Sequence, residues 1–396
     1  MFKRARRLEE VVGFGIDRVA AAADRVTQAN PAWPVLRMEN LDTDLPLPPE
    51  AIAATIESLA TPPANSWLPF TGDYALRGAI ADFLSERTGH RYDPEREIVI
   101  TSGGMEALLD VLLATVDEGD EVVLTDPTYA GLVNRVRLAG ALPRFAPFRA
   151  GEEWVLDLDA LNAAVGPTTA ALVLMSPSMP SGGTFTAADW SVICDICRNR
   201  DVALLYDSAM ERLLFDGRAL VHPLHRDGMT ERTVVVGSLS KEHRMIGWRV
   251  GWAAGPAEVI EDVGWVHVYN TTTPTGIARA AATAVLRGDQ GHVAECVAEL
   301  QRRRDTILGV LPGWPFVSPG GGWSMLVDVR SRGLEPLEAS RLLLEEMSVA
   351  ATPMIGWGGE VAARHVRLVF SAESVESLRT LGERAAGTRL AATLAG

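Results

Sequence analysis

Cysteine is scarce in this sequence, and long apolar runs are absent from it. Three cysteines among 396 residues are too few for a disulfide framework. No apolar stretch approaches the roughly 20 residues that a membrane-spanning helix needs. The basic N-terminal segment lacks the apolar core and the small-residue cleavage site of a signal peptide. We therefore expect a cytoplasmic protein.

Positive charge is in deficit as well. Lys and Arg total 37 against 51 Asp and Glu, which gives a formal net charge of −14. This balance favours solubility and argues against nucleic acid or an anionic membrane as a partner. A locally basic pocket for a small anion is compatible with it.

Two of the cysteines, Cys194 and Cys197, have the CxxC spacing of metal and redox sites. No second CxxC pair accompanies them in the sequence. The surrounding residues 189–200 have the pattern of an amphipathic helix, on which both thiols share one face. We interpret them as core cysteines and expect no metal site.

Residues 95–255 alternate short β-rich runs with helical stretches. The apolar runs are EIVIT (97–101), EVVLT (121–125), ALVLM (171–175), VALLYD (202–207) and TVVVG (233–237). Runs of this kind predict an α/β fold with a mostly parallel central sheet that helices cover on both faces. Ligands bind beyond the carboxyl ends of the strands in such sheets, so the residues after each strand are the candidates for chemistry.

The chain length suggests about two folding units. Long helical patterns around short strands follow residue 290 and indicate a smaller α+β unit, which the N-terminal arm joins. We expect residues 1–45 to form the arm and part of this smaller domain. Residues 46–288 are expected to form the large domain, and residues 289–396 the rest of the smaller one.

The most informative segment is VVVGSLSKEHRMIGWRVGW (234–252). A lysine at a strand end in a partly dry site, here Lys241, can have a lowered pKa and attack a carbonyl. Ser238, Ser240 and Arg249 together can bind a dianionic phosphate. The alternative is a surface lysine beside a structural arginine.

SLSK followed by GWRVGW resembles the cofactor-lysine signature of the class I/II aminotransferases, which are fold-type-I pyridoxal-phosphate enzymes. The resemblance implies that Lys241 holds pyridoxal 5'-phosphate as a Schiff base. It also implies that Lys241 shuttles the proton between the substrate α-carbon and the cofactor, and that Ser238 and Arg249 hold the phosphate.

Other strand ends follow the order of this family. Gly103, Gly104 and Met105 come after EIVIT at a helix start, where the family places a phosphate-binding turn. Glycine there lets backbone N–H groups approach an anion. Tyr129, in the DPTY turn, resembles the family's ring that stacks on the pyridine. A plain strand–helix turn and a packing tyrosine are the alternatives.

Two charged residues complete the resemblance. Asp207 ends the strand VALLYD 34 residues before Lys241, where the family has an aspartate that keeps the pyridine nitrogen protonated. Taken alone, such an aspartate would be a helix cap. Arg367 lies among apolar residues in HVRLVFSA (365–372), and the family uses the arginine of its similar motif to bind the substrate α-carboxylate. The alternative is a structural salt bridge.

Two departures from the family affect one cofactor atom. The family has an Asn and a Tyr that donate hydrogen bonds to the phenolic oxygen, and Met179 and Met210 stand at these positions. Methionine cannot donate, and the loss makes a phenolate more basic. We hypothesise that the imine with Lys241 keeps its proton to higher pH than in other aminotransferases. The alternative is a replacement hydroxyl from Ser178, Ser181 or Ser208.

Two further departures concern the substrate side. Trp67 stands where the family usually has a tyrosine that reaches the phosphate of the neighbouring subunit, and its indole N–H can still donate. The lead-in RMENLDTDLPLPP lacks the family's substrate-facing glycine, and we place Asn40 against the substrate. Asp42 and Asp44 nearby are compatible with a basic substrate or are solvated loop residues.

The resemblance spans nearly the whole chain and implies a homodimer with active sites at the subunit interface. It implies transfer of the α-amino group of an amino acid to a 2-oxo acid. One alternative is another reaction of the same cofactor on an amino acid, such as β- or γ-elimination, cyclisation or oxidation. A non-catalytic binding module on the same fold is a further alternative.

Overall fold

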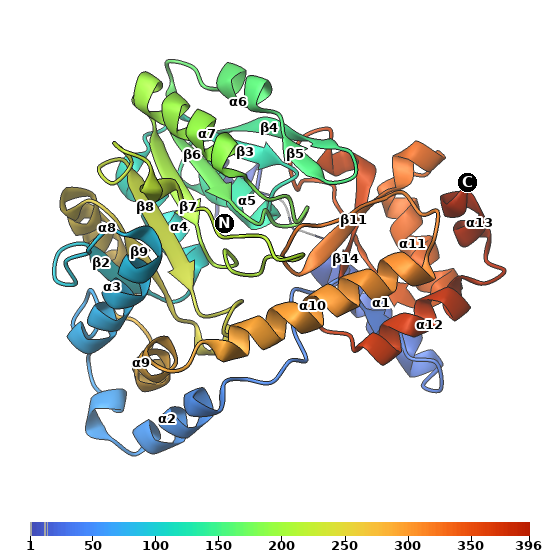
Figure 1. Ribbon diagram of the computed structural model, residues 1–396, viewed down its shortest axis with the longest axis horizontal. Helices are drawn as coiled ribbons and strands as arrows, with labels where there is room; N and C mark the ends of the chain where they lie inside the picture. The colour runs from blue at the N-terminus through green and yellow to red at the C-terminus, as the bar shows by residue number, and fades with distance from the viewer. Residues whose placement is uncertain (1, 12, 14) are drawn as a thin grey trace.

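The computed structural model describes residues 2–11, 13 and 15–396, and an eight-stranded sheet forms its centre (Figure 1). The spatial order is β2-β9-β8-β7-β6-β3-β4-β5. The strands are β2 (Ile98–Thr101), β3 (Glu121–Asp126), β4 (Leu142–Ala150), β5 (Trp154–Leu156), β6 (Thr169–Met175), β7 (Ala203–Asp207), β8 (Thr233–Ser238) and β9 (Gly251–Ala254). The strands from β8 to β4 are parallel, whereas β9 is antiparallel to both its neighbours and β5 to β4. The predicted α/β fold with a mostly parallel sheet is confirmed.

Helices cover both faces of this sheet, as the continuous apolar runs predict. Along β7, Leu204 and Leu205 belong to two separate core clusters, because successive side chains point to opposite faces. One face carries α4 (Gly104–Thr115), α5 (Ala130–Leu138) and α8 (Ala257–Asn270). The other carries α3 (Tyr74–Thr88), α6 (Leu158–Ala164) and α7 (Ala187–Arg200).

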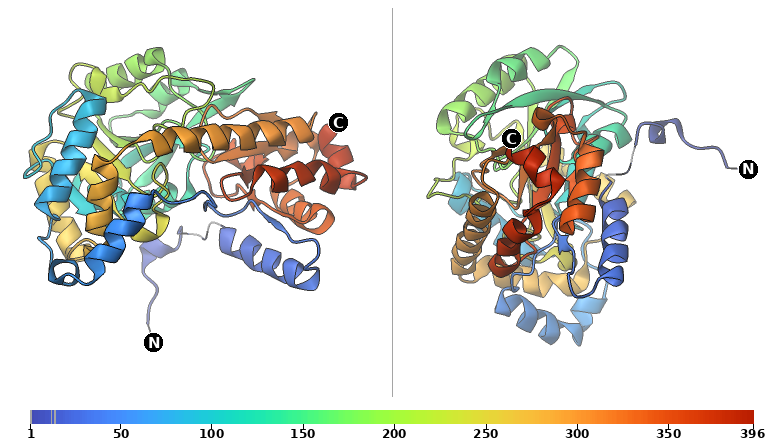
Figure 2. Two further views of the ribbon diagram at one scale, coloured as in Figure 1. Left: turned by 60° about the horizontal axis from the view of Figure 1, so that its bottom comes forward. Right: turned by 90° about the vertical axis from the view of Figure 1, so that its right-hand side faces the viewer.

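A smaller antiparallel sheet lies at the other end of the molecule, at the right of Figure 1. Its strands, in spatial order, are β10 (Phe316–Val317), β11 (Ser324–Asp328), β14 (His365–Val369) and β13 (Thr352–Pro353). The helices around it are α10 (Gly291–Val310), α11 (Pro336–Met347), α12 (Val375–Ala385) and α13 (Arg389–Ala395). Helix α10 runs from the large unit into this smaller one (Figures 1 and 2).

The N-terminal arm joins the smaller unit. Strand β1 (Leu36–Arg37) pairs in parallel with β12 (Val349–Ala350), and α1 (Ile16–Ala29) packs beside it (Figure 2). The smaller unit therefore contains segments from both ends of the chain, as expected. The domain boundaries near residues 45 and 288 stay predictions.

Two short helices lie at the opposite end, where α2 (Pro49–Leu59) packs against α9 (Arg279–Arg287). Among the described residues, no helix combines the length and apolarity that crossing a membrane requires. Cys194 and Cys197 lie buried and free on α7. Burial raises the pKa of their thiols to about 11 and about 12, so both stay protonated, as expected of core cysteines.

Candidate active site

The loop after β8 carries Lys241, three residues beyond the end of the strand. Its Nζ donates a hydrogen bond to Leu41 O at 3.4 Å and lies 4.4 Å from the centre of the Trp323 ring. Burial lowers the pKa of the Lys241 ammonium to about 8, and the positive charge of Arg367 acts in the same direction. An amine with this pKa is partly neutral near pH 7 and can attack a carbonyl.

Asp207 ends the neighbouring strand β7 and is only 1% exposed. Its Oδ1 accepts a hydrogen bond from Ala209 N at 3.1 Å, whereas Oδ2 has no partner among the residues that the structure describes. Burial raises the pKa of Asp207 to about 6, and the charge of Lys241 opposes this shift. A buried carboxylate oxygen without a partner is costly, so this atom indicates a donor on a bound group.

The predicted phosphate-binding residues come together at the start of α4. The Arg249 guanidinium donates to Ile246 O at 2.9 Å, to Ser102 O at 3.2 Å and to Ser240 Oγ at 3.5 Å. Gly103 has a φ of +89°, and a Cβ there would lie 2.2 Å from one Arg249 nitrogen, so the position requires glycine. Helix α4 begins directly afterwards without a side-chain cap, which leaves its first N–H groups available to an anion.

The remaining members of this set lie beside the same turn. A Cβ at Gly104 would be 3.6 Å from Ser238 Cβ, so the end of β8 touches the start of α4. Ser238 Oγ accepts a hydrogen bond from Ser240 N at 3.3 Å. The Met105 carbonyl, in the first turn of α4, accepts from Arg135 Nε at 2.7 Å. The end of β8, the residues that follow β2 and the first turn of α4 thus lie together.

Arg367, on β14, is completely buried. One terminal nitrogen donates to Glu39 O and, at 3.2 Å, to Thr352 Oγ1, and neither acceptor is a carboxylate. Nε and the other terminal nitrogen have no partner within the described part of the chain. Burial lowers the pKa of Arg367 to about 9. A buried guanidinium with unpaired donors needs an acceptor from a bound molecule, and its two recorded acceptors are not carboxylates, which argues against the structural salt bridge.

Tyr129 precedes α5, and its ring meets the Trp357 ring edge to face with the ring centres 5.6 Å apart. Both Asp126 carboxylate oxygens accept hydrogen bonds at 2.9 Å, from the N–H groups of Val361 and Ala362. Strand β3 thereby fixes the loop that carries Trp357. The same tryptophan ring lies 4.4 Å from the Arg367 guanidinium carbon, which brings the predicted tyrosine to the arginine.

Sequence reasoning missed both tryptophans of the site. Trp323 lies against Lys241, and Trp357 against Arg367. Glycines adjoin each of them, in GGGW (320–323) and GWGG (356–359). Close approach of the backbone, which glycine permits, was the signal that could have indicated them.

An ion pair between half-buried Arg212 and buried Glu242, which sequence reasoning also missed, holds the Lys241 loop. Glu242 accepts hydrogen bonds from Arg212 N at 2.8 Å and from Arg212 Nε at 2.6 Å. Arg212 follows Asp207 by five residues. The pair therefore ties the loop after β7, which follows Asp207, to the loop after β8, which carries Lys241.

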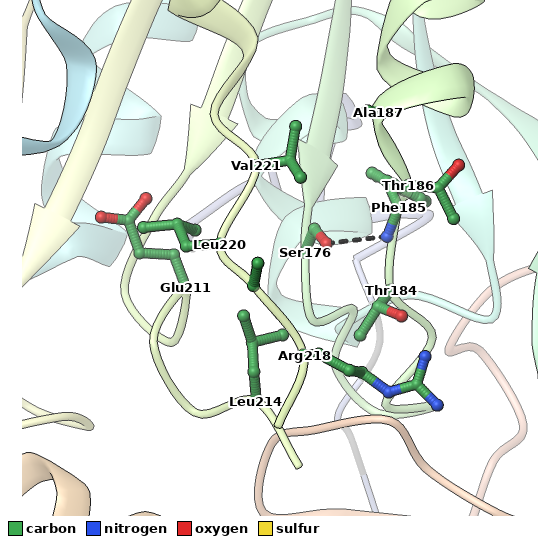
Figure 3. Close-up of a pocket in the computed structure, with 11 residues that line it drawn as sticks. Ser176, Thr184, Phe185, Thr186, Ala187, Glu211, Leu214, Arg218, Leu220 and Val221 are labelled. Carbon is green, nitrogen blue, oxygen red and sulfur yellow. Dashed lines mark hydrogen bonds between the residues drawn. The ribbon is translucent and has the colours of Figure 1, made fainter. Parts of the chain in front are cut away.

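A separate pocket of about 260 Å³ opens between the loops that follow β6 and β7 (Figure 3). Its wall includes Ser176 and Glu211, and neither Lys241, Asp207 nor Arg367 lines it. Ser176 Oγ is occupied by a hydrogen bond from Phe185 N at 2.9 Å, which Figure 3 marks. This pocket is therefore distinct from the charged site.

Comparison with known proteins decides what this arrangement is. The family model "Aminotransferase class I and II" matches residues 36–384, which is most of the chain. The chain belongs to this family.

The aminotransferase is 32% identical over 333 residues to arginine–pyruvate transaminase AruH of Pseudomonas aeruginosa, with 83% of each chain covered. It is 30% identical over 331 residues to an aspartate aminotransferase of Geobacillus stearothermophilus, covering 81% of this chain and 82% of the relative. N-succinyldiaminopimelate aminotransferase of Mycobacterium tuberculosis has a TM-score of 0.90 at 29% identity, covering 99% of this chain and 100% of that one. These relatives are named for different amino acids and share one reaction.

Class I and II aminotransferases use pyridoxal 5'-phosphate, and the residues of this chain fit that cofactor. Asp207 Oδ2 is a buried acceptor that lacks a donor among the described residues, as a pyridine N–H requires. The cradle of Gly103 and Arg249 beside a helix start offers donors to a phosphate. The Lys241 amine is available to an aldehyde.

Met179 and Met210, which we predict to stand in place of two donors of other aminotransferases, are both buried in the loops after β6 and β7. Of the hydroxyls considered as replacements, Ser208 donates to Val236 O at 3.1 Å and is directed at the sheet. Ser181 Oγ accepts a hydrogen bond from the N–H two residues later. The Ser208 hydroxyl therefore donates to the sheet backbone and not toward the cofactor.

Two predicted residues lie at the surface of the single aminotransferase chain. Trp67, between α2 and α3, is 78% exposed. Asn40 is exposed as well, and it precedes Leu41, whose carbonyl accepts from Lys241. Asn40 thus belongs to the segment that borders the site. For Trp67, no hydrogen bond to the site is recorded among the described residues.

Proposed function

We propose that this aminotransferase moves the α-amino group of an amino acid to a 2-oxo acid with Lys241 as the reacting amine. One observation carries the proposal: buried groups from both units, Asp207 and Arg367, direct unpaired polar atoms toward ligands that the described residues do not supply. A cofactor pyridine nitrogen and a substrate carboxylate are the two groups that complete them.

Pyridoxal phosphate, when bound, supplies an aldehyde and a ring that accepts an electron pair. Lys241 supplies the amine, and with a pKa of about 8 roughly a tenth of it is neutral at pH 7. The same nitrogen can take the proton from the substrate α-carbon and would return it to the cofactor carbon that carries the aldehyde. The buried ring of Trp323 lies beside Lys241 and covers one side of this amine from solvent.

The other site residues bind and orient. Asp207 holds a proton on the pyridine nitrogen, because a carboxylate at Oδ2 stabilises the cationic ring. Arg367 binds the substrate α-carboxylate through its unpaired donors, which orients the α-carbon relative to Lys241. Arg249, Ser238, Ser240 and the Gly103–Met105 turn bind the phosphate. Tyr129, Met179 and Met210 face the ring, and Asn40 the substrate.

We also propose a homodimer, supported by large apolar side chains exposed near α2 and α8. They are Ile52, Ile56, Leu59, Trp67, Phe70, Tyr74, Trp265, Tyr269 and Ile277. The segments that carry them are adjacent, since a Cβ at Gly264 would lie 3.4 Å from the Thr71 side chain. An exposed apolar surface of this kind is typical of a subunit interface. Trp67 would reach the phosphate of the second subunit from this surface.

The division into domains belongs to the same proposal. Residues 46–288 form the cofactor-binding domain, and residues 1–45 with 289–396 form the smaller one. The pairing of β1 with β12 supports the second assignment. A cytoplasmic location is supported by the three cysteines, all free and buried.

Borohydride trapping tests the proposal directly. Reduction of the cofactor-loaded protein followed by peptide mapping should place the label on Lys241, and a Lys241→Ala variant should take up none. Single amino acids with a 2-oxo acid should then yield the new amino acid in an amount equal to the new 2-oxo acid. Label on another lysine contradicts the role of Lys241, and ammonia as the nitrogen product indicates elimination or oxidation instead.

A further inference from the structure

A hydrogen-bonded chain of residues connects α8 to the phosphate cradle. His267, on α8, faces Glu106 in the first turn of α4, with Nδ1 2.8 Å from Oε1. The other carboxylate oxygen, Glu106 Oε2, accepts a hydrogen bond from Ser102 N at 2.5 Å. Both oxygens of Glu106 are thus occupied, one by each neighbouring element.

The Ser102 peptide group is held on its other side as well. Arg249 donates to Ser102 O at 3.2 Å. The backbone N–H of Ser102 therefore donates to Glu106, and its carbonyl accepts from Arg249. Since Gly103 follows directly and lies against the same guanidinium, the orientation of Ser102 sets both the turn and the arginine.

His267 is completely buried, and two carboxylates surround its Nδ1. Asp110 Oδ2 lies 3.8 Å from that nitrogen, and Asp110 Oδ1 accepts from Asn270 Nδ2 at 3.0 Å. Because Glu106 Oε1 is the acceptor nearest to Nδ1, we assign the proton to this nitrogen. His267 therefore donates to Glu106.

Glu106 lies where its own charge could interfere with phosphate binding, so its hydrogen bond from His267 matters. A carboxylate in the first turn of a helix competes with a phosphate for the same positive end. Bonds from Ser102 and His267 hold the carboxylate in one place. The N–H groups of Gly104 and Met105 then remain available to the ligand.

We propose that His267 and Glu106 are positioning residues for the cofactor phosphate, acting through Ser102 on the turn and on Arg249. This proposal rests on the proposed function, which assigns the phosphate to that cradle. Neither residue touches the pyridine ring or the substrate in this account. Their loss should therefore weaken binding of the phosphate selectively.

Comparison of pyridoxal phosphate with pyridoxal isolates this effect, because the two ligands differ only in the phosphate. Both are titrated into the cofactor-free protein, and binding is followed by absorbance and tryptophan fluorescence. His267→Leu removes the donor. His267→Asn keeps an N–H donor close to the Nδ1 position. His365→Gln alters another buried histidine, whose Nδ1 lies 2.7 Å from Val361 O in the smaller unit, and is the control.

We expect His267→Leu to bind pyridoxal phosphate about tenfold more weakly than the unaltered protein, a loss typical of one hydrogen bond to a charged group. Pyridoxal affinity should stay within about twofold. His267→Asn should recover most of the lost affinity, and His365→Gln should leave the ratio of the two affinities unchanged. If His267→Leu does not fold, His267→Gln removes the donor from the Nδ1 position and should show the same selective loss.

The outcomes separate this inference from the proposed function. An unaltered protein that does not prefer pyridoxal phosphate over pyridoxal refutes the phosphate cradle itself. If the unaltered protein shows the preference and His267→Leu keeps it, the cradle stands and the positioning role is refuted. Equal weakening of both ligands also refutes the role, because it indicates general damage to the fold.

Discussion

At Lys241, Asp207 and Arg367 burial is the largest influence on the pKa, and each shift favours the neutral form. Asp207 and Arg367 are almost completely buried, so their remaining polar atoms need partners from bound molecules. Such shifts at adjoining groups are typical of active sites. The chemistry of the site thus follows from where the chain places three side chains.

The pKa of Lys241 predicts how the cofactor-free protein takes up pyridoxal phosphate. Only the neutral amine attacks an aldehyde, and the fraction of neutral amine grows as pH rises through about 8. The association rate, measured by stopped-flow absorbance, should therefore rise with pH and level off above about 8. A free lysine derivative in the same buffers is the control. A rate that still climbs beyond pH 9, as for an ordinary lysine amine, would contradict the lowered pKa.

Met210 allows a test of the changed cofactor environment. The imine between Lys241 and the cofactor should keep its proton to higher pH than in other aminotransferases. The reason is that methionines, which cannot donate, stand where the family has two donors to the phenolic oxygen. Met210→Tyr should restore a donor and lower the pKa of the bound chromophore by about one unit. Absorbance titration of the loaded protein measures it, and Met229→Leu, another buried methionine change, should leave it in place. A chromophore pKa below neutrality in the unaltered protein would disprove the hypothesis.

At the scale of elements, the loops after β7 and β8 are joined by the Glu242–Arg212 pair. Glu242→Gln removes the charge and leaves the half-buried Arg212 guanidinium without its carboxylate partner. We expect a loss of about 3 kcal/mol in the free energy of unfolding, measured by urea titration. Glu335→Gln, which breaks the exposed pair with Arg330, should change it by less than about 0.5 kcal/mol. Similar losses in the two variants would show that the buried pair contributes no special stability.

Elements with strong local patterns were predictable, and those without them were not. The apolar runs of β2, β3, β6, β7 and β8 end within a residue or two of the observed strands. Strand β4 was missed because Pro143 and Pro147 normally exclude a paired strand. In the structure both prolines lie where β4 pairs with β3 alone, before β5 begins to pair on the other side. A free edge there tolerates residues without an N–H group.

At the scale of the whole molecule, the apolar surface near α8 predicts assembly. Tyr269, 85% exposed, and Trp265 lie on its outward side. Trp265→Glu combined with Tyr269→Glu should convert a dimer to a monomer, because charge would have to be buried in the interface. Light scattering during size-exclusion chromatography measures the mass. Leu337→Glu, at an exposed apolar residue on α11, should remain a dimer, and a monomeric unaltered protein would refute the proposal.

By itself, the sequence determined the fold class and predicted the reacting amine, because the periodicity of apolar runs and the spacing around Lys241 are local properties of the chain. Tertiary structure alone decided what surrounds that amine. Glu39 and Arg367 are 328 positions apart, and the Glu39 carbonyl accepts a hydrogen bond from Arg367. Glu106 and His267 are 161 positions apart and are in hydrogen-bond contact. Such contacts depend on how the sheet and the two chain ends pack, and residue spacing carries no record of that packing.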